Sequence, residues 1–281
     1  MSIAVNLVEN MEASTLFVEK RLSIRSPTHL ERAVAEIESL MRIRKAGGSY
    51  NVNFIVEKVF DNRAECCSII LEHCDDGTIE KLIDLSRERR EQIPERRVWH
   101  TLASLTKALC MTHNGVNMDR PEVQIPDWDC ICHLDIKPGN VFLTRRQKKG
   151  EFSRVVLGDF GCAVTKSDIN AGKANRIGQT RGTDGWFPPE SVPSLTGTSN
   201  GRYGKPSDIW QVGAVVQAMC RLLVEPDMDL VVINRACGSS YSRELNRMVK
   251  WMMDPDPSKR PSVRELAFEV RREMEKRGET F

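Results

Sequence analysis

The stretch CHLDIKPGNVFLT, residues 132–144, brings three side chains that could do chemistry close together. Asp135, Lys137 and Asn140 supply a carboxylate, an ammonium group and an amide, and Pro138-Gly139 lies between them. Pro and Gly disfavour a helix interior and favour turns, so we expect a tight loop in front of the apolar run. Such a loop can aim all three groups at one point, although Asp, Asn, Pro and Gly are also ordinary turn residues.

A second carboxylate follows in the motif LGDFG, where Asp159 comes shortly after the apolar run 155–157. Two carboxylates and an amide oxygen on loops form the oxygen environment that Mg²⁺ prefers, together with water and phosphate oxygens. Phosphoryl transfer depends on such positioning and charge neutralisation more than on covalent catalysis. The two motifs together favour Mg²⁺-dependent phosphoryl transfer over a role as turns alone.

Apolar periodicity indicates the elements that must position these loops. Alternating β-branched and aromatic residues predict strands, and recurrence at helical spacing predicts helices. The turn at 75–77 divides an early strand-rich part from a later helical part, and 163–185 shows little periodicity, which is typical of a functional segment. The expected strands are 3–8, 16–22, 54–60, 67–71, 141–144 and 155–157, and the expected helices are 31–44, 79–90, 98–113, 208–223, 242–253 and 262–276.

Charge and cysteine content limit the class of protein. The chain has 41 basic and 39 acidic residues, a net charge of +2, so we expect no nucleic-acid or membrane partner. Nine cysteines without a recognisable signal peptide favour an intracellular location, cytoplasmic or nuclear, over a disulfide framework. Cys130, Cys132 and His133 lie close together but lack the second ligand pair of a zinc site.

Five motifs in series resemble those of a eukaryotic-type protein kinase catalytic domain: HLDIKPGN, DFG, GTDGWFPPE, SDIWQVG and KRPSV. The resemblance covers the chain from Ile3 to the C-terminal helix. It implies one kinase domain over 1–281 with an α+β, bilobal fold. A small β-rich N-lobe with one helix and the hinge would occupy 1–74, and a larger helical C-lobe would occupy 75–281.

The resemblance also implies roles for the loop residues. Asp135 would orient the substrate hydroxyl and accept its proton, and Lys137 would neutralise the transferring phosphoryl group. Asn140 and Asp159 would hold Mg²⁺ on the phosphates of ATP. Thr183 can bond to both Asp135 and Lys137, and this pairing resembles the serine/threonine pattern rather than the tyrosine one.

The nucleotide site implied by the resemblance lies mostly in the N-lobe. Lys20, in FVEKRL, resembles the lysine that contacts the α and β phosphates, and Glu36 resembles its ion-pair partner. Glu38 is the alternative, but Glu36 fits better because Leu40 and Ile43 then face the core. The strand and turn SIILEHCDDG resembles the hinge. The implied adenine contacts are Leu71 as gatekeeper, the backbone of Glu72 and Cys74, and the side chains of Val5, Val18 and Phe142.

Within the kinases, the chain is most similar to the NIMA-related (Nek) kinases. The shared features are Val18 two residues before Lys20, the LEHCDDG hinge, a loop inserted ahead of the catalytic motif, NVFL and LGDFG. This resemblance implies a serine/threonine kinase that transfers the γ-phosphate of ATP to protein hydroxyls. Glu190 and Arg260 resemble an ion pair that ties the activation segment to the C-lobe, and Asp208 resembles the acid that braces the catalytic loop.

Three departures from the family pattern matter, of which Pro188-Pro189-Glu190 in place of alanine-proline-glutamate is minor. No glycine occurs before Gly47, so the G-x-G-x-x-G loop and the first N-lobe strand, expected ahead of residue 3, are missing. We expect a chain that starts late rather than a lost loop; a pseudokinase acting as a binding scaffold is the alternative. A small-molecule phosphotransferase is disfavoured by GTDGWFPPE and Arg260. Leu134 replaces the arginine that usually receives an activation-loop phosphate, so we expect activity independent of a phosphate at Ser167 or Thr180.

Overall fold

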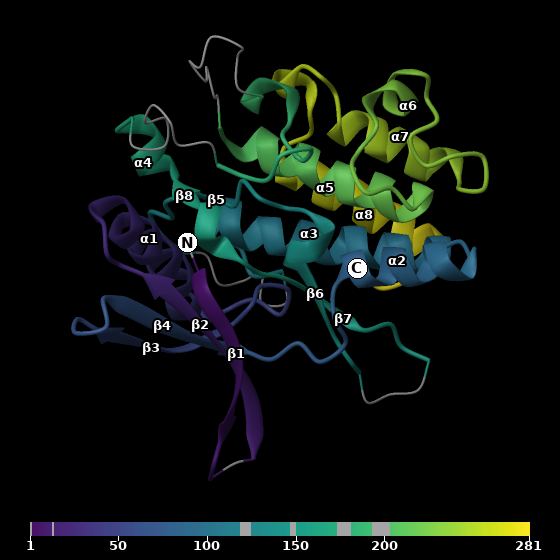
Figure 1. Cartoon of the computed structure of the whole chain (residues 1–281). Helices are drawn as coiled ribbons and strands as arrows, with labels where there is room; N and C mark the ends of the chain where they lie inside the picture. Colours follow the sequence, from purple (N-terminus) through teal and green to yellow (C-terminus); the bar gives the residue numbers. More distant parts are fainter. Residues whose placement is uncertain (1, 13, 119–124, 147–149, 173–180, 193–202) are drawn as a thin grey trace.

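The computed structural model describes residues 2–12, 14–118, 125–146, 150–172, 181–192 and 203–281. A small sheet with one long helix forms the N-terminal lobe, and a larger group of helices forms the C-terminal lobe (Figure 1). The α+β, bilobal fold predicted from the sequence is confirmed. No helix in the described part of the chain is long and apolar enough to cross a bilayer.

The N-lobe sheet is antiparallel and has the order β1-β2-β4-β3. Its strands are β1 (Ser2–Asn10), β2 (Thr15–Ser23), β3 (Ile55–Asp61) and β4 (Cys66–Glu72). The register pairs Val5 with Lys20 and Val18 with Leu71. Because side chains alternate between the faces of a strand, these four residues lie on one face of the sheet. That face carries the residues expected to meet the nucleotide.

Helix α1 (Pro27–Lys45) packs beside this sheet and begins four residues before its predicted start. The Ser26 side chain caps it by accepting a hydrogen bond from the His29 N–H, and Pro27 occupies the first turn, where no donor is required. Its buried stripe contains Ile37, Leu40 and Ile43, with the carboxylate of Glu36 among them. The helix thus carries a charged side chain into the core of the lobe.

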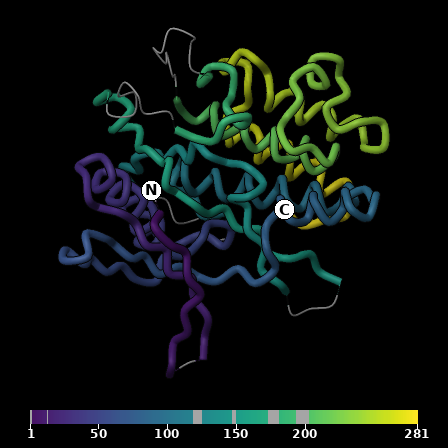
Figure 2. The backbone as a smooth tube through the Cα atoms, viewed as in Figure 1, coloured from purple at the N-terminus to yellow at the C-terminus, as the bar shows by residue number. Residues whose placement is uncertain are grey.

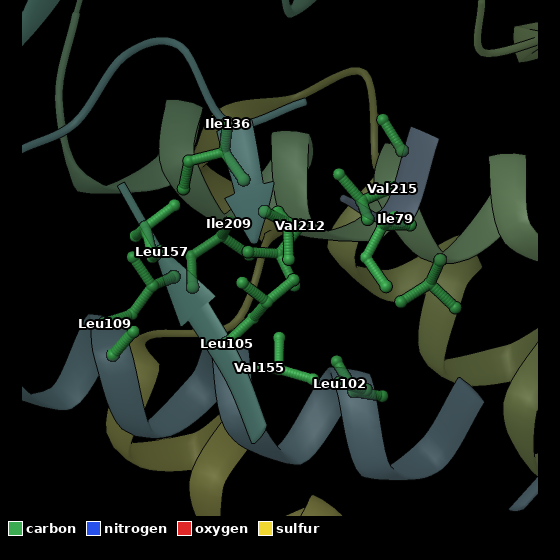
Figure 3. Packing of buried hydrophobic residues seen from close by; sticks show 14 of the residues in the cluster. Ile79, Leu102, Leu105, Leu109, Ile136, Val155, Leu157, Ile209, Val212 and Val215 are labelled. Carbon is green, nitrogen blue, oxygen red and sulfur yellow. The ribbon is translucent and has the colours of Figure 1, made fainter. Parts of the chain in front are cut away.

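The C-lobe is built on two buried helices, α3 (Glu95–Asn114) and α5 (Lys205–Arg221). Leu102, Leu105 and Leu109 of α3 pack in one cluster with Ile209, Val212 and Val215 of α5, next to the strand β7 (Arg154–Leu157; Figure 3). The last helix, α8 (Val263–Lys276), packs along α3 (Figure 2). The other C-lobe helices are α2 (Ile79–Arg89), α6 (Met228–Val232) and α7 (Arg243–Met252).

Short elements make up much of the chain between α3 and α5. They are β5 (Ile131–Cys132), η1 (Pro138–Asn140), β6 (Val141–Thr144), β7 (Arg154–Leu157), η2 (Phe160–Cys162), β8 (Val164–Thr165) and α4 (Lys166–Asn170), with η3 (Pro189–Ser191) and η4 (Pro257–Lys259) further along. The hairpin β6-β7 matches its prediction. The segment 163–185 was expected to lack regular structure, and this is wrong at its start: β8 pairs with β5, and Thr165 caps α4. Two-residue strands and a five-residue helix are too short to show a periodicity.

Candidate active site

The buried carboxylate of Asp208, at the start of α5, binds the backbone of the catalytic loop. Asp208 Oδ1 accepts the Leu134 N–H at 2.8 Å and Oδ2 accepts the His133 N–H at 2.9 Å. His113, at the end of α3, contacts Oδ2 through Nε2 at 2.8 Å. Leu134 has φ +62°, an unfavourable value for a residue with a side chain, and the two carboxylate bonds stabilise it. Sequence reasoning did not identify His113, although its position on the buried face of α3 was a signal.

The structure brings together the four residues predicted to be catalytic, Asp135, Lys137, Asn140 and Thr183. Thr183 Oγ1 donates to Asp135 Oδ1 at 2.7 Å and accepts from Lys137 Nζ at 2.7 Å. Asn140 Nδ2 donates to the carbonyl of Asp135 at 2.8 Å and to its Oδ2 at 3.0 Å. The Asp135 carboxylate therefore has a fixed orientation, with each oxygen held by a different neighbour.

Gly182 is what lets Thr183 approach this loop. A Cβ at position 182 would lie 2.8 Å from the carbonyl oxygen of Leu134, and the residue has φ +109°, which only glycine adopts readily. The two chain segments can therefore meet at Asp135 only if residue 182 has no side chain.

Lys20 lies between two carboxylates. Its Nζ is 2.7 Å from Glu36 Oε1 and 2.7 Å from Asp159 Oδ1, so Glu36, rather than Glu38, is its partner on α1. Burial alone would lower the pKa of Lys20, but the two carboxylates outweigh it and the pKa is raised. Burial raises the pKa of Asp159 in turn, and the facing ammonium group of Lys20 more than reverses this, so its pKa is lowered. Lys20 is a cation and Asp159 an anion at neutral pH.

The Glu36 carboxylate is nearly inaccessible, with 3% of its side chain exposed. Burial raises its pKa, and the ammonium group of Lys20 opposes that effect. The ion pair with Lys20 is therefore the main compensation for a charge inside the N-lobe core. Loss of Lys20 would leave that charge buried and unpaired.

The residues after Asp159 are anchored by His133. The Phe160 ring is buried and meets the His133 ring edge-on, with centroids 4.7 Å apart. His133 Nδ1 accepts the Asp135 N–H at 3.2 Å, so its proton lies on Nε2, which contacts the Gly158 carbonyl at 3.0 Å. One imidazole thus couples Asp135, the predicted base, to the segment that carries Asp159.

The predicted adenine contacts lie at the junction of the lobes. Val18 and Leu71 lie side by side in the sheet, while Val5, on the same face, is 63% exposed. Phe142 comes from β6 in the C-lobe, and its ring lies so close to Gly158 that a Cβ there would be 2.7 Å from Phe142 Cε2.

The hinge residues follow directly at the end of β4. The Glu72 carboxylate forms an ion pair with Arg154 and accepts the Phe54 N–H at 3.0 Å. The Glu72 side chain is therefore engaged within the protein. This is compatible with the predicted adenine contact, which uses only the backbone of Glu72. Burial raises the pKa of the Cys74 thiol, which stays protonated at neutral pH.

Asn140 and Asp159 offer oxygen atoms to a cation. Asn140 uses Nδ2 for its bonds to Asp135, which leaves its amide oxygen as the donor atom for a metal. Asp159 binds Lys20 through Oδ1, and 43% of its side chain is exposed. A carboxylate and an amide oxygen, completed by water and phosphate oxygens, suit Mg²⁺, so these residues fit the group that the sequence implied.

Leu134 belongs to a small buried apolar cluster. It packs with Cys130, Cys132, Val164 and Tyr203 in a cluster separate from the main core. The Sγ atoms of Cys130 and Cys132 are 3.7 Å apart, and within the described ranges no group of three or more His, Cys, Asp or Glu side chains is placed to hold a metal. The place of the usual arginine is thus occupied by apolar packing.

The activation segment is tied to the C-lobe as the sequence implied. Arg260 makes a two-pronged ion pair with Glu190, with both N···O distances 2.7 Å. Arg260 also donates to the carbonyls of Asp254 and Pro206. Thr180, one of the two possible phosphorylation sites, lies outside the described residues, whereas the Ser167 N–H donates to Asp129 Oδ1 at 3.2 Å.

Comparison with known proteins agrees with this geometry. The family model of the protein kinase domain matches residues 3–269. A probable serine/threonine-protein kinase nek2 of Dictyostelium discoideum is 26% identical over 93% of this chain and 58% of its own length. Human serine/threonine-protein kinase Nek2 is 26% identical over 94% of this chain and 57% of its own length. The G2-specific protein kinase fin1 of Schizosaccharomyces pombe is 23% identical over 92% of this chain and 35% of its own length.

The chain therefore spans little more than half the length of the two nek2 relatives. The resemblance to Nek kinases predicted from the sequence is confirmed. With the family match extending over nearly all of its length, the chain belongs to the protein kinase domain family.

Proposed function

We propose that this chain is a serine/threonine protein kinase that transfers the γ-phosphate of ATP to a hydroxyl of a protein substrate. The observation that carries the proposal is the pair of 2.7 Å bonds through which Thr183 joins Asp135 to Lys137. A carboxylate base and a cation are thereby held side by side, as transfer of a phosphoryl group to a hydroxyl requires.

In this mechanism Asp135, Lys137 and Lys20 have separate roles. Asp135 accepts the proton of the substrate hydroxyl as its oxygen attacks phosphorus. Lys137 places its ammonium group against the charge that develops on the transferring group, where a fixed cation acts strongly. Lys20, fixed between Glu36 and Asp159, would bind the α and β phosphates, which are not transferred.

Magnesium would be held by the amide oxygen of Asn140 and the carboxylate of Asp159. When bound, the ion supplies neutralisation of the phosphate oxygens. The contribution of the chain is to orient both ligands: Asn140 is fixed by Asp135, and Asp159 is fixed by Lys20. We also propose an intracellular location, cytoplasmic or nuclear, supported by nine cysteines that are all free thiols.

The experiment is a transfer assay with labelled ATP and Mg²⁺ on a mixed Ser/Thr peptide pool, beside a Tyr pool. Asp135→Asn should lower transfer at least about 100-fold, because general-base catalysis contributes that much. Asp84→Asn, on the exposed side of α2, is the matched control and should behave as the unmodified chain. Equal background signals from all three proteins would refute the proposal and favour a non-catalytic binding scaffold.

A further inference from the structure

A cavity of about 830 Å³ lies on the C-lobe, away from the residues of the candidate active site. It is formed where the end of α5, the loop after α6 and the start of α7 meet. In Figure 1, α6 and α7 lie on the side of the C-lobe farthest from the N-lobe sheet. We call it the arginine cavity, because its lining includes Arg221, Arg235, Arg243 and Arg247, with Asn234 and Ser239 among its uncharged polar residues.

The arginine cavity has no internal counter-charge. Of the described residues that line it, four carry a guanidinium group and none carries a carboxylate. Elsewhere in this chain arginines meet acids, as Arg260 meets Glu190. The acid Asp227, which precedes α6, is outside the lining and caps that helix by accepting the N–H groups of Asp229 and Leu230. Outside the lining, the Glu273 carboxylate interacts electrostatically with Arg247. Four cations around one cavity still repel one another, so a bound anion would relieve an electrostatic penalty.

One of these arginines is held in a fixed position. The Arg221 guanidinium donates to the carbonyls of Arg235, at 2.6 Å, and Ala236, at 3.4 Å. It lies against Gly238, where a Cβ would come within 3.2 Å of Arg221 Cζ. A guanidinium that is already ordered loses little entropy when it binds a ligand, and its planar fork suits the oxygens of a phosphate.

The surroundings of the cavity favour a protein as the source of the phosphate. Val232 and Ile233, next to Asn234 and Arg235 in the sequence, are 64% and 58% exposed. Apolar side chains beside an arginine cluster suit a peptide that carries both a phosphate and apolar residues. The net charge of +2 gives no broad field of the kind that draws nucleic acid or an anionic membrane onto a protein surface.

We propose that the arginine cavity binds a segment of a partner protein that carries phosphoserine or phosphothreonine. Arg243 and Arg247, four residues apart on one face of α7, would receive the phosphate with Arg221. Binding here requires neither ATP nor phosphoryl transfer, so the site can be tested whatever the outcome of the transfer assay. Its occupant would leave the cleft between the lobes free.

The test is fluorescence anisotropy with labelled short peptide pools of identical randomised flanks, with a central phosphothreonine, threonine or glutamate. The phosphorylated pool should bind at least about tenfold more tightly than either of the others, the effect of one charge-assisted hydrogen bond. Arg243→Ala/Arg247→Ala should remove that preference. Arg243→Lys/Arg247→Lys should restore only part of it, because lysine keeps the charge but loses the two-pronged geometry.

The matched control is Arg63→Ala/Arg264→Ala, which removes the same charge from exposed positions on the β3-β4 turn and on α8. This variant should bind the phosphorylated pool as the unmodified chain does. Equal loss in both double variants, or equal binding of the glutamate pool, would overturn the proposal. Tighter binding of phosphatidylserine vesicles or single-stranded RNA through Arg243 and Arg247 would also overturn it, because the ligand would then be of another class.

Discussion

Thr183 Oγ1 lies 2.7 Å from Asp135 Oδ1 and 2.7 Å from Lys137 Nζ, so a single hydroxyl connects the activation segment to the proposed base and to the proposed phosphate-binding cation. The two bonds fix the hydroxyl proton on the side of Asp135. The arrangement makes the position of the base depend on a residue 48 positions away in the chain.

Thr183→Ala should lower kcat by about tenfold or more with a small change in the KM for ATP, because the base loses its orientation and the nucleotide contacts remain. Thr183→Ser keeps the hydroxyl and should restore most of the rate. The measurement is steady-state kinetics on a peptide substrate. If alanine and serine at this position gave equal rates, the hydroxyl bridge would have no part in the reaction.

Gly182→Ala should have the same kinetic effect for a different reason. The added methyl group meets the Leu134 carbonyl, so Thr183 is pushed away from Asp135. A loss of kcat in this variant with an unchanged melting temperature would locate the effect at the site. A fully active Gly182→Ala enzyme would contradict the close approach.

The pH dependence of Mg²⁺-dependent ATP binding should report on Lys20. Lys20 lowers the pKa of Asp159, so the carboxylate stays ionised and its stabilising pairing is lost only as the pH falls through that lowered pKa. Binding should therefore be constant from about pH 8 to about pH 5. In Lys20→Met the main group that opposes the burial effect is lost, so the pKa of Asp159 rises and binding should weaken at a higher pH. Calorimetry at stepwise pH values gives the binding affinity of the unmodified chain and of Lys20→Met. If the affinity of both proteins fell at the same pH, the coupling between Lys20 and Asp159 would be refuted.

Leu134→Arg should destabilise the fold rather than create a working phosphate receiver. The Leu134 side chain is 2% exposed among apolar neighbours, and an unpaired buried charge there costs about 3 to 5 kcal/mol. Leu134→Met, which conserves volume, should cost less than about 1.5 kcal/mol. Urea unfolding followed by circular dichroism compares the two variants. Similar unfolding midpoints would mean that position 134 can reach solvent.

Activity should also be independent of phosphate on the activation segment, because no arginine at position 134 is present to receive it. The double variant Ser167→Ala/Thr180→Ala and a phosphatase-treated sample should both keep the turnover of the untreated chain. A many-fold fall in either sample would refute this expectation.

The sequence predicted the fold and the main site residues wherever a motif or a long period marked them. Glu36 could be chosen over Glu38 because helical spacing placed Leu40 and Ile43 on the core side of α1, and the ion pair with Lys20 agrees with that choice. Gln211 and His113 were not identified, since their partners lie 75 and 95 residues away in the chain. The helical spacing of α3 could place His113 on a buried face, but it could not indicate which residue His113 contacts.

Several short elements could not be predicted from the sequence either. Helix α6 has five residues, with its start fixed by the Asp227 side chain rather than by apolar spacing. The arginine cavity could not be seen in the sequence either, because it gathers charges from α5, α7 and the loop after α6, and each charge alone resembles an ordinary exposed arginine.

The contacts from α5 to the catalytic loop have a consequence for its motion. Asp208 and Gln211, on successive turns of a buried helix, accept the amide hydrogens of His133, Leu134 and Ile136. These amides sit in a loop, yet they are tied to the most deeply packed helix of the C-lobe. Their exchange with deuterium should therefore be as slow as that of α5 itself, so the catalytic loop belongs with the rigid frame of the molecule.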